Sequence, residues 1–196
     1  MRHHELLRQW REGLAWLPTS GRMVRVTNQV STEIAQVRKA AWATYGETLS
    51  GAVSEFLMPG APENHVRFAP HAVLYLQWEA RFPQEWRAAA PYTPWGTKKD
   101  VLWHFADRGP TAATRAALED LVMAAVCRPH RCEDRRFSAL ARRLDGPGLR
   151  ARLREASGTE DPNVALRATF VCWVLDHPDA PVTVASWRNW VAAHLR

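Results

Sequence analysis

The chain has few of the residues that would link it to a familiar compartment or chemistry. Of its 26 basic side chains only three are lysines, and its three cysteines (Cys127, Cys132 and Cys172) are too few for a disulfide framework. The odd cysteine count favours a reducing compartment. No apolar run approaches the roughly 20 residues that a membrane-spanning helix needs. The sequence therefore predicts a cytoplasmic protein that does not engage a membrane.

The sequence also lacks the short motifs that place catalytic groups or nucleotides. It has no glycine-rich phosphate loop, no H-E-x-x-H helix and no G-x-S-x-G nucleophile turn. Cys127, His130 and Cys132 have a Cys-x2-His-x-Cys spacing, but zinc sites need four ligands and no second pair follows. We therefore expect no metal, no other cofactor and no catalytic residue. A zinc site with Cys172 or His177 as a distant fourth ligand is the alternative.

What the sequence does have is the composition of an ordinary globular protein. Its 196 residues are 46% apolar and 23% charged, which is enough to bury a core in one domain or a compact pair. Ten tryptophans provide large anchors for that core or for an interface. Composition alone thus excludes a disordered or fibrous chain.

The apolar residues recur almost everywhere with the period of a helix, which predicts an all-α fold. We divide it into an N-terminal helical region over 1–58, a connecting loop over 59–70 and a helical array over 71–196. Residues 83–95, rich in proline and aromatics, are expected to be irregular. The expected helices are 4–17, a long pattern from Ile34 to Leu57, 71–81, 97–107, 112–127, 133–144, 148–157, 162–176 and 184–195, and a short strand is possible at 23–27.

One turn in the array carries a family resemblance. The stretch SGTEDPNVALRA, residues 157–168, places Asp161 where it can cap a helix and Pro162 at the first helical position. An Asp-Pro turn followed by an apolar residue and an arginine resembles the inter-helix turn and second helix of a HEAT-type repeat. The resemblance implies an antiparallel, HEAT-like array of helices that presents a binding surface.

The chain's excess charge is concentrated in one stretch, residues 128–154, which we name the arginine segment. Nine arginines minus three carboxylates leave it at +6, which equals the charge of the whole chain. On an ideal helix over 133–144, the arginines fall opposite the apolar stripe. The helix over 148–157 carries Arg150 and Arg154 on one face. If the two helices pair, their basic faces merge into one ridge suited to phosphates.

We therefore predict a non-enzymatic α-helical binding module that engages nucleic acid, a nucleoprotein or an acidic protein surface as one subunit of a larger complex. The predicted contacts are Arg128, Arg131, Arg135, Arg136, Arg142, Arg143, Arg150 and Arg154.

Three other interpretations stay open. The first is a protein-binding adaptor or toxin-neutralising partner with tryptophan anchors. The second is a glycosylase-like enzyme acting on DNA, in which Asp100, Trp103, Trp173 and Asp176 would line a cleft. The third is a solvated arginine face that binds nothing.

Overall fold

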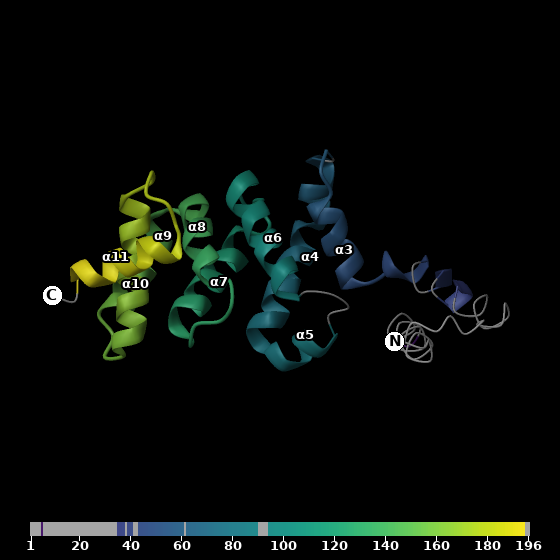
Figure 1. Ribbon diagram of the computed structural model, residues 1–196. Helices are drawn as coiled ribbons and strands as arrows, with labels where there is room; N and C mark the ends of the chain where they lie inside the picture. The colour runs from purple at the N-terminus through teal and green to yellow at the C-terminus, as the bar shows by residue number, and fades with distance from the viewer. Residues whose placement is uncertain are drawn as a thin grey trace. The chain divides into compact units, whose positions relative to one another are not determined.

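The structure is a computed structural model that describes residues 5, 35–37, 39–40, 43–60, 62–89 and 94–194. All regular elements in these residues are helices and none is a strand, so the all-α prediction is confirmed (Figure 1). The chain divides into two units, residues 1–55 and 56–196. Apart from Glu5, the expected helix over 4–17 lies outside the described residues, as does the possible strand at 23–27.

In the first unit a turn at residues 46–48 separates two helical stretches of the pattern expected from Ile34 to Leu57. The first helical stretch ends at Tyr45, and the helix α3 (Leu49–Leu57) begins after Thr48. The Thr48 hydroxyl accepts a 3.0 Å hydrogen bond from the backbone N–H of Gly51, which caps the new helix. A side chain at Gly51 would meet the carbonyl oxygen of Tyr45, so glycine is needed there for close approach.

The second unit consists of the end of α3 and eight further helices within the described residues. Their bounds are α4 (Pro62–Arg81), α5 (Pro83–Ala89), α6 (Pro94–Arg108), α7 (Arg115–Cys127), α8 (Arg135–Leu144), α9 (Pro147–Ser157), α10 (Pro162–Asp176) and α11 (Val184–His194).

Two expectations about this unit are wrong, for one reason. The loop expected over 59–70 is helical from Pro62 onward, and the stretch expected to be irregular, 83–95, contains α5 and the start of α6. A proline suits the first position of a helix, where its missing N–H has no partner to lose. Pro62, Pro83 and Pro94 all occupy that position, so these prolines mark the starts of helices and not breaks between them.

The helix α10 joins several neighbours. Its N-cap, Asp161, accepts hydrogen bonds from the backbone N–H groups of Asn163 and Val164, as the sequence predicted. Its buried residues lie on more than one side of the helix, and it packs against α7, α8 and α9. The helix α10 therefore lies between two layers of helices and packs against both.

Candidate functional site

The structure gives several arginines of the arginine segment a role inside the fold. Arg142 Nε donates to the Val174 carbonyl oxygen at 3.2 Å, and one Nη atom donates to the His177 carbonyl oxygen at 2.9 Å. Arg143 Nε donates to the Ala106 carbonyl oxygen at 2.7 Å. The last carbonyls of a helix have no partner within it, so these two arginines complete the ends of α10 and α6.

Two further arginines turn inward to a buried ionic cluster. Arg128 binds both carboxylate oxygens of Glu79 at 3.2 Å, and Arg131 binds the same carboxylate at 3.1 Å. Lys98 Nζ lies 2.7 Å from Asp134 Oδ1 and 3.4 Å from Glu79 Oε2. Burial alone would raise the pKa of Glu79, but the hydrogen bond from Arg128 and the charges of Lys98 and Arg128 hold it below the ordinary value. The cluster stabilises the segment between α7 and α8.

All but one of the remaining five arginines are paired with a carboxylate. The pairs are Arg135 and Arg136 with Glu133, Arg150 with Asp145 and Asp176, and Arg152 with Asp120. Within the described residues, Arg154 is the one arginine of this segment whose guanidinium has neither a hydrogen bond nor an ion pair. Carboxylates of the buried cluster thus hold Arg128 and Arg131, and backbone carbonyl oxygens hold Arg142 and the exposed Arg143. The convergence of these guanidiniums on one water-facing ridge stays a prediction.

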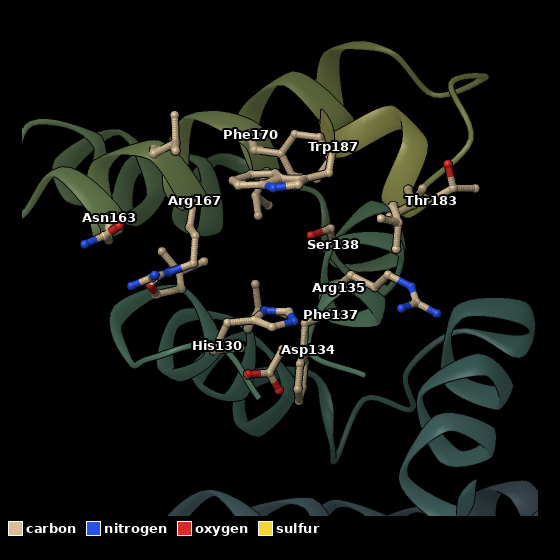
Figure 2. Close-up of a pocket in the computed structure, with 17 residues that line it drawn as sticks. His130, Asp134, Arg135, Phe137, Ser138, Asn163, Arg167, Phe170, Thr183 and Trp187 are labelled. Carbon is tan, nitrogen blue, oxygen red and sulfur yellow. Dashed lines mark hydrogen bonds between the residues drawn. The ribbon is translucent and has the colours of Figure 1, made fainter. Parts of the chain in front are cut away.

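A different feature has the form of a binding site. A pocket of about 310 Å³ lies between α7, α8, α10 and the beginning of α11 (Figure 2). Its lining is mainly apolar, and Figure 2 shows Phe170 and Trp187 on one side with His130 and Asp134 opposite. The rings of Phe170 and Trp187 meet edge to face at 4.8 Å. The remaining apolar residues of the lining are Val122, Ala125, Val126, Phe137, Leu166, Val171, Val182 and Val184.

The segment that carries His130 and Asp134 is held in an unusual conformation. Glu133 has a φ of 65°, a left-handed value that residues other than glycine rarely adopt. Its carboxylate accepts a hydrogen bond from Arg136 Nε at 2.6 Å, and the neighbouring Asp134 is fixed by the buried cluster. Strained backbone persists where surrounding contacts determine it, and it occurs often beside functional sites.

Ser138, His130 and Asp134 all line the pocket, and these are the residue types of hydrolytic triads. Nucleophilic catalysis requires a hydrogen bond from nucleophile to base and from base to carboxylate. None of these three side chains is hydrogen-bonded to another in the described part of the chain, and Lys98 and Arg128 both bind Asp134 Oδ1. These three side chains therefore do not form a catalytic triad in the described residues.

The residues singled out for a DNA-acting enzyme do not line this pocket. Trp103 is 59% exposed, Asp100 lies beside Lys99 at 3.5 Å, and Asp176 is bound by Arg150 at 2.6 Å. Trp173 is also absent from the lining of the pocket.

The Cys-x2-His-x-Cys stretch is at the surface, where Cys127 and Cys132 are both exposed and free. In the ranges that the structure describes, no three side chains of the metal-binding types come together. Those same ranges hold no helix with the length and apolar character that crossing a membrane would require.

Comparison of the chain with protein-family models, curated proteins and solved structures found no match. The packed helices are compatible with a helical repeat array, and the specific HEAT-like resemblance stays a prediction. Sequence reasoning missed the pocket. Two residues of the lining were noted in the sequence: Arg167, as the arginine of the repeat-like motif, and Trp187, as one of ten tryptophans. The residues around them in the sequence have no pattern that indicates a cavity.

Proposed function

We propose that the second unit is a non-enzymatic α-helical protein-binding module, and that its pocket receives an apolar side chain of the partner. The observation that carries the proposal is the pocket itself, which is open, mainly apolar and edged by polar groups. Its volume of about 310 Å³ is at the lower end of the range of roughly 300–1,000 Å³ that binds small ligands. That is room for one large side chain, and such anchors supply most of the affinity of an interface.

The contacts of the arginine segment favour a protein over a nucleic acid as the partner. Phosphate binding depends on guanidiniums that are free to replace counterions. Arg128, Arg131, Arg142 and Arg143 are held by groups of the protein, so half of the eight predicted contacts would first have to break bonds within the fold. Of the interpretations drawn from the sequence, the adaptor therefore fits best.

The HEAT-like array belongs to the same proposal. The helices α7 and α8 pack together, as do α9 and α10, and α10 also contacts α7 and α8. Stacked helical pairs of this kind place a binding site between successive pairs, which is where the pocket lies.

Selection from a random-peptide phage library on the full chain tests the function. Ala125 is buried on α7 and lines the pocket, so Ala125→Phe fills it. Ala116 is exposed on the same helix and outside the lining, which makes Ala116→Phe the matched control. We expect enriched peptides that bind wild type and Ala116→Phe equally and lose at least about tenfold in affinity with Ala125→Phe.

Circular dichroism establishes that both variants are folded before binding is compared. Two results contradict the proposal: a selection that enriches no peptide, or peptides whose affinity is the same for Ala125→Phe as for wild type. The second result would place any binding surface elsewhere on the chain.

A further inference from the structure

One arginine at the edge of the pocket has a fixed side chain and unused donors. Arg167, on α10, is half-buried, and its Nε donates a 2.7 Å hydrogen bond to the carbonyl oxygen of Val126. Its two Nη atoms have no hydrogen bond or ion pair with any residue that the structure describes. Because Nε is bound, the plane of the guanidinium is set, and its outer edge presents parallel N–H groups.

The charges around the pocket complement an anion. Arg167 and Arg135 both line it, and the Arg135 guanidinium is 3.7 Å from Glu133, whose carboxylate binds Arg136 more closely at 2.6 Å. Asp134 is the one carboxylate of the lining. Lys98 and Arg128 neutralise its charge, and its second oxygen accepts the N–H of Arg131. No free negative charge of the lining therefore opposes an incoming carboxylate.

We infer that the pocket recognises an apolar side chain with a carboxylate beside it, and that the Nη atoms of Arg167 bind the carboxylate. The inference rests on the proposed function and specifies its partner, which is an acidic protein segment. A guanidinium and a carboxylate match as two parallel N–H···O bonds, so a neutral amide in the same position would leave donors unpaired. The apolar lining supplies affinity, and Arg167 supplies discrimination between acid and amide.

Two dyes that differ in one charged group test this chemistry without the peptide selection. 8-Anilino-1-naphthalenesulfonate carries an anion beside an aromatic frame, and its sulfonate substitutes for the carboxylate. N-phenyl-1-naphthylamine has the same frame without the sulfonate. Fluorescence titration of the full chain gives both affinities. We expect the anionic dye to bind wild type about tenfold more tightly than the neutral dye, a difference of about 1.4 kcal/mol, because its sulfonate accepts charge-assisted hydrogen bonds from Arg167.

The variants locate the effect. Arg167→Gln is expected to weaken the anionic dye about tenfold and to leave the neutral dye unchanged, which also shows that the pocket persists. Arg167→Lys keeps the charge but loses the paired geometry, so we expect an intermediate loss. Arg154→Gln removes the same charge from an exposed position and is expected to have no effect. Ala125→Phe is expected to weaken both dyes.

Equal affinity of the two dyes for wild type, or an anionic dye unaffected by Arg167→Gln, would overturn the inference. So would binding of both dyes that Ala125→Phe leaves intact, because the dyes would then lie elsewhere. The outcome of the peptide selection, which tests the proposed function, is independent of the outcome of the dye titrations, which test the inference. If peptides bind the pocket but exchange of their Asp or Glu for Asn or Gln changes nothing, the proposed function survives and the inference does not.

Discussion

The Lys98 ammonium lies 2.7 Å from Asp134 Oδ1, and both side chains are almost completely buried. The pair joins α6 to the residue that precedes α8 and thereby fixes the segment that forms one wall of the pocket. Burying an ion pair removes hydration from both charges, so the gain depends on how well the remaining groups are satisfied. Here Glu79, Arg128 and Arg131 complete the set, which leaves three cations and two carboxylates together.

This charge count predicts an unequal response to single substitutions. Glu79→Gln leaves three cations facing one carboxylate, and we expect the free energy of unfolding to fall by about 3–5 kcal/mol. Lys98→Met leaves two of each sign and should destabilise the protein less. Urea denaturation followed by circular dichroism measures both changes, and Lys99→Met, at the exposed neighbouring position, is the control. A larger loss for Lys98→Met than for Glu79→Gln would contradict the balance described here.

Arg142 gives a second prediction, about stability rather than binding. Its guanidinium bridges the Val174 and His177 carbonyl oxygens at the end of α10. Arg142→Met leaves those acceptors without their donor, so we expect a loss of about 1–3 kcal/mol in the free energy of unfolding. The matched variant is Arg154→Met, which removes a guanidinium that has no partner among the described residues and should change stability by less than about 0.5 kcal/mol. Equal effects of the two variants would mean that the Arg142 contacts do not stabilise the fold.

The sequence predicted helices well and side-chain partners poorly, for a physical reason. A helix end is set by local chemistry, such as the Asp161 cap and the proline after it, so the expected helix at 162–176 matches α10 at both ends. The group that an arginine side chain binds is determined by tertiary contacts. Arg128 binds Glu79 at a separation of 49 residues, and no periodicity in the segment around Arg128 encodes that pairing. A run of arginines has the same sequence whether it faces water or holds helix ends.

The pocket was beyond sequence reasoning for the same reason. It is assembled from four helices, and its apolar residues have the spacing of ordinary core positions. Only the packing of α11 over α10 decides whether the space beside Trp187 is filled or left open.

Two stacked histidines give a prediction for pH. The rings of His65 and His104 lie 5.3 Å apart, Phe56 contacts both of them, and Phe105 contacts His65. His65 Nδ1 and His104 Nε2 are buried without a hydrogen-bond partner in the described part of the chain. Burial lowers the pKa of both imidazoles, and the charge of Arg108 lowers it further. The folded protein therefore resists protonation of this pair.

The sign of the effect follows from proton linkage. The folded pKa lies below the unfolded value of 6.5, so the unfolded chain binds more protons as the pH falls through that region. The stability present above about pH 6.5 is expected to be lost progressively below it. Urea midpoints between about pH 7.5 and pH 5 measure the loss, which His104→Phe should reduce and His71→Phe, at an exposed position, should not. A midpoint that stays constant over this range would contradict the prediction.

The last prediction separates the protein-binding proposal from nucleic-acid binding by the arginine segment. Each phosphate neutralised on duplex DNA contributes about −0.9 to the slope of log affinity against log salt. In the described residues the Arg154 guanidinium has no hydrogen bond or ion pair and that of Arg135 has only the 3.7 Å ion pair with Glu133. By contrast, Arg150 and Arg152 lie 2.6 Å and 2.9 Å from carboxylate oxygens. Fluorescence anisotropy of a labelled duplex between about 50 and 200 mM salt gives the slope for each variant.

We expect Arg135→Gln/Arg154→Gln to change the slope by no more than about 2, which is the contribution of two guanidiniums that no carboxylate binds closely. Further replacement of Arg150 and Arg152 by glutamine should then leave the slope unchanged, because their carboxylate partners already neutralise them. An additional change of about one unit per arginine would mean that these guanidiniums exchange Asp145, Asp176 and Asp120 for phosphates. The arginine segment would in that case be a nucleic-acid surface, and the pocket would not be the main binding site of the chain.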